Sequence, residues 1–263
     1  MDCMTEQHTD EQNTEWGKAS GVAALERAFS ILHCFRAGEE AVSLAELARR
    51  TGLYKSTILR LLGSLEYGGF VRKLPDGNYS VGPEPLRLAQ IYQDSFRVKH
   101  VIQPVLQQLS KESGETSSFY VRQGNSRIVL HRVEPSRTVR FSVREGERFP
   151  IEHGASGKVL QAFSQPHPKG FEEARERLWC VSYGERDPET ASASVPVFGI
   201  GQELQGALTV SGPKERIGSV APMRNACRLL LAAGAQVTAA LGGDPGVFAH
   251  SLEQLDTVPF PTP

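Results

Sequence analysis

Residues 43 to 67 read SLAELARRTGLYKSTILRLLGSLEY, and this stretch decides the fold of the first part of the chain. It starts with a serine three residues before a glutamate, a capping-box pattern, so we expect a short helix from Leu44 to Arg50. Gly52 can adopt the left-handed conformation that ends one helix and redirects the chain. A further helix is expected from Lys55 to Tyr67. Two helices joined by such a tight turn are typical of a helix-turn-helix.

The flanking residues extend this pattern in both directions. Upstream, apolar residues recur at helical spacing and predict another helix that ends near Gly38. Its expected apolar stripe consists of Leu25, Ala28, Phe29, Leu32 and Phe35. Downstream, two strand-prone runs surround the turn Pro75-Asp76-Gly77 and predict a β-hairpin. Three helices followed by a hairpin make a winged helix-turn-helix, which we assign to residues 21–84.

The helix over residues 55–67 has the chemistry of a DNA-reading element. Its apolar stripe is Ile58, Leu61, Leu62 and Leu65, which leaves a polar face exposed. From residue 47 to residue 73 there are six basic residues and one acid, in a chain of formal net charge −1, so the basic charge is local. Arg60 is placed to reach a base edge, and the hairpin cations suit phosphates. The candidate DNA contacts are Arg49, Lys55, Ser56, Thr57, Arg60, Ser64, Arg72 and Lys73. A winged helix used for protein–protein contact is the alternative interpretation.

The rest of the chain changes from helical to strand periodicity. We expect an amphipathic linker helix over residues 85–96, suited to a dimer seam, and a further helix that ends at Ser113. Strands are expected at Ser117–Arg122, Ile128–Val133, Thr138–Arg144, Ala191–Val197 and Leu204–Ser211, with a long helix at Val220–Leu241. This predicts an antiparallel α+β domain over residues 97–242. Residues 1–20, which are acidic, and 243–263, which contain prolines, are expected to be flexible tails.

Composition excludes several classes of protein. With 263 residues, 40% of them hydrophobic, the chain has enough apolar residues for a core. The four cysteines are far apart, which argues against a zinc ribbon, an iron–sulfur cluster or a dithiol redox motif and favours a reducing compartment. The sequence has no signal-peptide pattern and no apolar run long enough for a membrane span. We expect a cytoplasmic protein with no membrane partner, cofactor or metal.

The segment Gly154-Ala155-Ser156-Gly157-Lys158 opens a predicted helix. It is not a Walker A loop, because Glu152 stands where that motif requires glycine and Val159 where it requires serine or threonine. The free N–H groups of such a turn would suit a carboxylate ligand, and a plain, closely packed helix start is the other interpretation. No nucleophile, base and oxyanion hole come together in the pattern, so we predict no catalytic residue.

The ordered set of motifs resembles the IclR-type transcriptional regulators from about Val22 to Leu241. The segments that carry the resemblance are ALERA at 24–28, LAELA at 44–48, GLYKST at 52–57, RLL at 60–62, LE at 65–66, YSVG at 79–82, GET at 114–116, RVE at 132–134, GK at 157–158, VPV at 195–197 and LTVSGP at 208–213. The resemblance implies a bacterial regulator with an N-terminal winged helix, a linker helix and a GAF-like effector domain. It also implies a small organic acid or aromatic metabolite as effector, and a dimer or dimer of dimers on a palindromic operator.

Effector contacts of the family correspond to particular residues of this chain. They are main-chain groups of the helix-opening turn and polar positions on the strands: Ala155, Ser156, Gly157, Ser182, Ser192, Thr209 and Ser211. Some members have an acid where this chain has Ser182, so the polar character is kept and the charge is lost. The stretch from Ser164 to Trp179 is shorter than in the family and lacks a helix or two.

We therefore expect an α+β, ligand-responsive, DNA-binding regulator that acts as a repressor. Two alternatives stay open. The first is a constitutive DNA-binding regulator with a degenerate effector domain, which the shortened stretch and Ser182 favour. The second is an enzyme built on the GAF-like domain, which would need a catalytic cluster that the sequence does not show.

Overall fold

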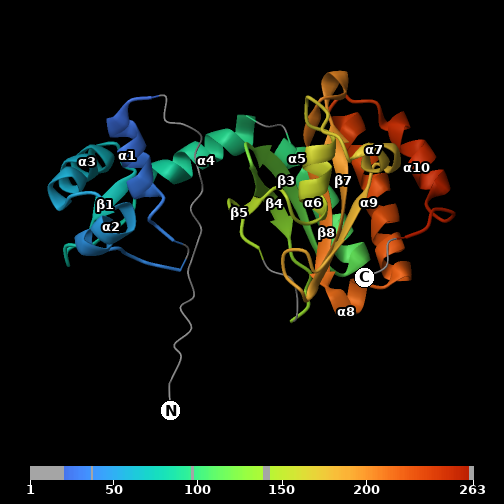
Figure 1. Cartoon of the computed structure of the whole chain (residues 1–263), viewed down its shortest axis with the longest axis horizontal. Helices are drawn as coiled ribbons and strands as arrows, with labels where there is room; N and C mark the ends of the chain where they lie inside the picture. Colours follow the sequence, from blue (N-terminus) through green and yellow to red (C-terminus); the bar gives the residue numbers. More distant parts are fainter. Residues whose placement is uncertain (1–20, 37, 96–97, 139–142, 261–263) are drawn as a thin grey trace, which may run out of the picture. The chain divides into compact units, whose positions relative to one another are not determined.

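The computed structural model describes residues 21–36, 38–95, 98–138 and 143–260. The chain divides into two compact units, residues 1–92 and 93–263, and each is described by itself (Figure 1). The first unit contains the predicted three helices and a hairpin. Its elements are α1 (Ala23–Leu32), α2 (Leu44–Thr51), α3 (Lys55–Tyr67), β1 (Val71–Lys73), β2 (Tyr79–Val81) and the start of α4 (Glu84–Ser95). This order confirms the winged helix-turn-helix, and α4 corresponds to the predicted linker helix.

The turn between α2 and α3 is fixed by local chemistry. The hydroxyl of Ser43 accepts a hydrogen bond of 3.2 Å from the N–H of Glu46 and so caps α2, as its sequence predicts. Gly52 ends α2 at φ 69°, and its N–H donates to the Ala48 carbonyl at 2.9 Å. An isolated bridge between Val42 and Tyr79 ties the start of α2 to the hairpin. The buried core is Ile31, Cys34, Val42, Leu47, Ile58, Leu62, Val71 and Tyr79.

The predicted apolar stripe of the first helix is wrong in part. Leu25 and Phe29 are each 55% exposed, whereas Ile31, which the stripe omitted, is fully buried. The helix ends at Leu32, earlier than predicted. The small core of this unit contacts only the last turn of α1, so the apolar face of its first turns lies in solvent.

The second unit is built on one antiparallel sheet of six strands in the order β5-β4-β3-β8-β7-β6. Helices lie on both of its faces (Figure 1). The strands are β3 (Thr116–Gln123), β4 (Ser126–Val133), β5 (Arg148–Pro150), β6 (Cys180–Tyr183), β7 (Thr190–Phe198) and β8 (Leu204–Pro213). The helices are α5 (Val98–Ser113), α6 (Ala155–Ala162), α7 (Glu172–Arg177), α8 (Lys214–Ile217), α9 (Val220–Ala240) and α10 (Ala249–Gln254), with short 3-10 turns η1 (Ile200–Gln202) and η2 (Pro245–Phe248). Among the described residues, no helix combines the length and the apolar composition that a membrane span requires.

Strand periodicity divides the core of this unit into two layers. Successive side chains of a strand point to opposite faces, so Phe119 and Leu208 pack with α5 and α9, while their neighbours Tyr120 and Ala207 pack with α6. The larger layer contains most of α9, for example the fully buried Leu230. The smaller layer under α6 leaves room for polar side chains of the same face.

Four of the predicted strands are present, and their bounds differ by few residues. The fifth, Thr138–Arg144, includes residues 139–142, which lie outside the described residues; Val143 and Arg144 are not in a strand. The edge strands β5 and β6 were not predicted, because three or four residues show too little periodicity. The stretch from Ser164 to Trp179 contains the six-residue helix α7.

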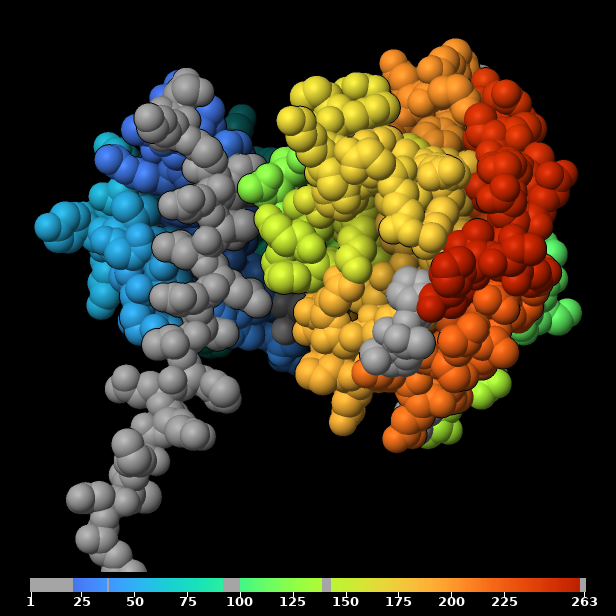
Figure 2. Space-filling model, turned by 45° about the vertical axis from the view of Figure 1, so that its right-hand side comes forward, coloured from blue at the N-terminus to red at the C-terminus, as the bar shows by residue number. Residues whose placement is uncertain are grey.

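The prediction of a flexible tail from residue 243 is wrong for residues 243–260. This segment forms η2 and α10 and packs on the second unit, where it appears in red in Figure 2. Phe248 and Leu255 are fully buried, and Phe260 stacks on Trp179 with ring centroids 4.6 Å apart. Prolines suggested a tail, but the widely spaced apolar residues between them bind the segment to the core.

Substitution of Phe248 tests the packing of residues 243–260 on the second unit. A Cβ at Gly234 would lie only 2.9 Å from its ring, so the fit against α9 is close. We expect Phe248→Ala to lower the free energy of unfolding by about 3–5 kcal/mol, as for other buried phenylalanines. Val247→Ala, one residue away and 37% exposed, is the control and should change it by less than about 0.5 kcal/mol. Chemical denaturation measures both, and equal effects would contradict the packing.

Candidate functional site

The polar face of α3 lies in solvent as predicted. Ile58 and Leu62 are buried, and the opposite face exposes Lys55, Ser56, Arg60 and Ser64, with Thr57 half-buried. Among the described residues, neither Lys55 nor Arg60 has a hydrogen-bond or ion-pair partner in the protein. Two cations on one exposed helix face are therefore available to an anionic partner.

Other cations of the basic segment are engaged within the protein. Arg49 donates to both carboxylate oxygens of Glu46, at 2.8 and 2.7 Å. Arg50 bonds to Glu46 and Glu39 and is held against the Cys34 carbonyl. Hydrogen bonds from Arg49 and Arg50 lower the pKa of Glu46 to about 2, so this acid stays charged. The side chain of Arg49 is exposed although it pairs with Glu46, whereas the side chain of Arg50 is largely buried in these contacts.

The hairpin places Arg72 and Lys73 in solvent on β1. The Nε of Arg72 donates to the hydroxyl of Ser80 at 2.8 Å, which orients its guanidinium. Directly before α3, Tyr54 is 85% exposed.

The second unit contains a small cavity between the sheet and the start of α6. Its volume is about 30 Å³, enough for a water molecule or two. The residues that line it are Tyr120, Arg127, Gly154, Ala155, Ser156, Ser182, Arg186, Thr190, Ala191, Ser192, Thr209 and Ser211. Six of the seven predicted effector positions are in this set. Gly157 is not, and Tyr120, Arg127 and Arg186 were missed.

Strand register explains why hydroxyl groups meet at this cavity. Ser182, Ser192, Ser211 and Thr116 are directly opposite one another on four neighbouring strands. A second row joins Ser194, Thr209 and Ser118. Paired residues of an antiparallel sheet share a face, so both rows face α6. Ser182, Ser192, Ser211 and Thr209 of these rows line the cavity, and their hydroxyls can donate or accept hydrogen bonds, which makes the cavity suited to a small polar ligand.

Gly157 has a packing role beside the cavity. A Cβ at this position would lie 2.2 Å from the Ile151 carbonyl oxygen and 2.6 Å from Nη1 of Arg127. The absence of a side chain therefore lets the guanidinium of Arg127 lie against the first turn of α6.

Arg127 is the most unusual group of the cavity. Its exposed fraction is 4%, one guanidinium nitrogen donates to the His153 carbonyl, and its buried Nε has no partner in the described part of the chain. Burial lowers the pKa of Arg127, since the charged form loses hydration. The guanidinium lies 5.6 Å from the Tyr120 ring centroid and 5.8 Å from that of Phe149. Both rings attract the cation, and the nearby carboxylates of Glu185 and Glu152 partly offset the effect of burial on its pKa.

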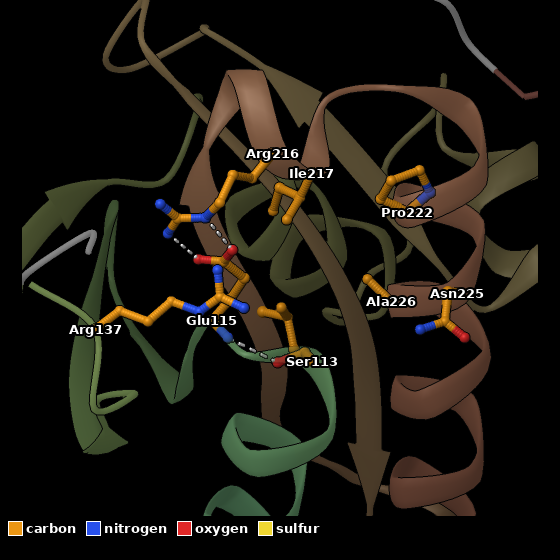
Figure 3. Close-up of a pocket in the computed structure, with 9 residues that line it drawn as sticks. Ser113, Glu115, Arg137, Arg216, Ile217, Pro222, Asn225 and Ala226 are labelled. Carbon is orange, nitrogen blue, oxygen red and sulfur yellow. Dashed lines mark hydrogen bonds and ion pairs between the residues drawn. The ribbon is translucent and has the colours of Figure 1, made fainter. Parts of the chain in front are cut away.

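A second, larger cavity of about 290 Å³ lies on the other side of the sheet, where Val210 faces α9. Figure 3 shows Arg216 and Arg137 extending toward Glu115 there. Glu115 is 2% exposed and receives two hydrogen bonds of 2.7 Å from Arg216, a bidentate pair. None of the predicted site residues lines this cavity, and its buried acid already has a partner, so we treat the pair as structural.

The buried thiols show no sign of reactivity. Burial raises the pKa of Cys180 to about 12 and raises that of Cys227 as well, so both stay protonated at neutral pH. Within the described ranges, no three metal-binding side chains gather in one place. These observations agree with the interpretation of the two cysteines as core residues.

Comparisons with known proteins cover both units. The family model "IclR helix-turn-helix domain" matches residues 24–75, and "Bacterial transcriptional regulator IclR C-terminal" matches residues 90–170 and 168–239. The glycerol operon regulatory protein of Streptomyces griseus is 28% identical over 223 residues, which are 76% of this chain and 88% of that protein.

Solved structures agree with the match to these family models. An IclR transcriptional regulator from Alicyclobacillus acidocaldarius superposes with a TM-score of 0.71 at 26% identity, covering 84% of this chain and all of that chain. An IclR homologue from Microbacterium hydrocarbonoxydans, solved with 4-hydroxybenzoate, gives 0.70 at 20% identity and covers 83% and 99% of the two chains. Since the two family models together match more than half of the sequence, the chain belongs to the IclR family of bacterial transcriptional regulators.

Proposed function

We propose that this regulator binds a palindromic operator and that a small organic or aromatic acid, bound in the second unit, changes its affinity for DNA. The observation that supports DNA binding is the exposed face of α3, with Lys55 and Arg60 available to an anionic partner. The helix would enter the major groove, where arginine pairs with guanine O6 and N7. Arg72 and Lys73 of the hairpin would bind phosphates and set the register. Such a protein acts at the chromosome, in the bacterial cytoplasm.

A homodimer or dimer of dimers is the proposed assembly. Val22, Leu25 and Phe29 of the α1 region are 63%, 55% and 55% exposed, and Leu86 and Ile91 of α4 are 74% and 51% exposed. Exposed apolar residues at helical spacing favour contact with a second apolar surface. One winged helix makes few base contacts, so two copies on a palindrome would multiply both affinity and specificity.

The proposal that an effector binds in the second unit depends on the small cavity. Its hydroxyl rows and the start of α6 suit a ligand that carries a carboxylate. An effector can change DNA binding only through its different affinity for the conformations that bind DNA well and poorly. We propose that the outcome at the operator is repression.

A constitutive regulator is the second candidate function. The observation that favours it is the cavity volume of about 30 Å³, since an aromatic acid needs more space and some lining elements must move to admit it. An enzyme is the third alternative, and it lacks support: the family relatives are regulators and the thiols beside the sheet are protonated.

The DNA-binding proposal predicts different effects for two cations. Arg60→Ala should relax base preference at one operator position, with a loss of about 1–3 kcal/mol of discrimination. Lys73→Ala should weaken binding to all sequences about equally and reduce the salt dependence by about one phosphate contact. Mobility shifts at two salt concentrations, on a fragment enriched by genomic pull-down, measure both.

The two variants control for each other, since each removes one exposed cation from the same unit. Identical losses on specific and non-specific DNA would contradict the base-reading role of Arg60. If the pull-down enriches no site, the operator proposal is wrong.

The effector proposal predicts stabilisation by ligand. A screen of aromatic and short-chain carboxylates, 4-hydroxybenzoate included, should find a compound that raises the melting temperature with increasing concentration. The same compound should change operator affinity in mobility shifts. If no compound stabilises the protein and the protein still binds the operator tightly, the result favours the constitutive regulator instead.

A further inference from the structure

Gly63 lies in the middle of α3, where glycine makes a helix less stable than alanine would. A folded protein needs a glycine where the backbone has a positive φ or where a Cβ would clash. Neither applies to Gly63: it is helical, and among the described residues no atom lies within 4 Å of the position that its Cβ would occupy. Every other described glycine has a positive φ or a neighbour within that distance. The packing of the described residues therefore gives no reason for a glycine at this position.

The place of Gly63 on the helix points to a partner outside the chain. One face of α3 carries the residues at i, i+4, i+7 and i+11, which are Ser56, Arg60, Gly63 and Tyr67. All four are exposed, and Tyr67 is 97% exposed. Along the helix axis, Arg60 lies about 4.5 Å before Gly63 and Tyr67 about 6 Å after it. The exposed face thus has a gap between two long side chains.

Such a gap matters for a helix that enters the major groove of DNA. The groove is about 12 Å wide, and an α-helix with its side chains is about 10–12 Å across, so the helix fits with little room to spare. The side chains at the centre of the exposed face therefore set how deep the helix can enter. An arginine pairs with guanine only within hydrogen-bond distance of the base edge, so the contact of Arg60 depends on that depth.

We propose that Gly63 is a specificity-determining position of this regulator: its missing side chain lets the backbone of α3 come close to the DNA, at the depth where Arg60 reaches a base edge. The inference rests on the DNA-binding role proposed above and adds to it a residue that contributes by having no side chain. Gly63 is a positioning residue, since it acts through Arg60. The stability lost to a helical glycine is then offset by sequence-specific binding.

Gly63→Ala should change stability and DNA binding in opposite directions. Because alanine is the better helix former, calorimetry of the full chain should show the melting temperature of the first unit raised by about 4–8 °C. Binding to the genomic fragment enriched by pull-down should weaken about tenfold, and Gly63→Leu, with its longer side chain, should weaken it further. Binding to a duplex of the same length and shuffled sequence should change by less than about twofold, because phosphate contacts dominate non-specific binding.

Ser30→Ala is the control. Ser30 lies in α1, and its hydroxyl donates to the Arg27 carbonyl, 2.7 Å away in the same helix. Alanine is the better helix former here too, so this variant should raise the melting temperature and leave both DNA affinities unchanged. A loss of operator affinity in Gly63→Ala but not in Ser30→Ala separates the DNA contact from stabilisation of the unit.

The link to Arg60 is measured by combining Gly63→Ala with Arg60→Ala. Once the arginine is absent, the added methyl group should cost little further operator affinity, so the two losses should not be additive in free energy. The inference is wrong if Gly63→Ala and Gly63→Leu keep the wild-type affinity, if they weaken shuffled DNA as much as the operator, or if the two losses are additive.

The same data separate this inference from the proposed function. Operator binding that depends on Arg60 but not on Gly63 would overturn the inference and leave the proposed function intact. A wild-type protein that binds the enriched fragment no better than shuffled DNA would overturn both.

Discussion

The alternation of side chains along β3, β7 and β8 is the constraint on which the second unit depends. Apolar residues such as Phe119, Leu208 and Val210 occupy one face and form the core with α5 and α9. The residues between them place hydroxyl groups on the other face, and strand register aligns these groups across four strands. A shift of one residue in any strand would exchange the two faces, so the core that stabilises the sheet also fixes the polar lining of the cavity.

The two units depend on different physical interactions. In the first unit, a capped helix and a left-handed Gly52 set the direction of α3, and eight buried side chains hold it. The polar face of α3 follows from that packing. In the second unit the groups that line the small cavity come from strands and loops far apart in the sequence. Neighbouring acids Glu39 and Glu46 reduce the basic charge of the first unit to a few available cations.

Local sequence patterns were sufficient to predict much of the fold of the first unit. The 55–67 helix, its buried stripe and the turn at Gly52 follow from periodicity and glycine chemistry, and the structure has them at nearly the same residues. The face of α1 was predicted wrongly because amphipathic spacing does not tell which apolar surface meets the core and which is left in solvent. The packing of residues 243–260 depends on Phe248 meeting α9, a long-range contact without a local signal.

The small cavity also depends on long-range contacts that local sequence patterns do not reveal. Resemblance to the family gave its strand hydroxyls and the start of α6, but Arg127, Tyr120 and Arg186 come from other elements, and only the fold brings them together. Nothing in the neighbourhood of residue 127 in the sequence indicates that an arginine will be buried beside a helix N-terminus. Its burial, with 4% of the residue exposed, is visible only in the folded structure.

In the proposed function, ligand binding in the second unit and DNA binding in the first are coupled. The most direct measurement is a closed thermodynamic cycle by calorimetry: effector affinity with and without operator, and operator affinity with and without effector. Coupled binding predicts that both affinities change by the same factor, since coupling free energies are reciprocal. An effector that binds the protein but leaves its operator affinity unchanged, and whose own affinity is unchanged by the operator, would contradict the coupling.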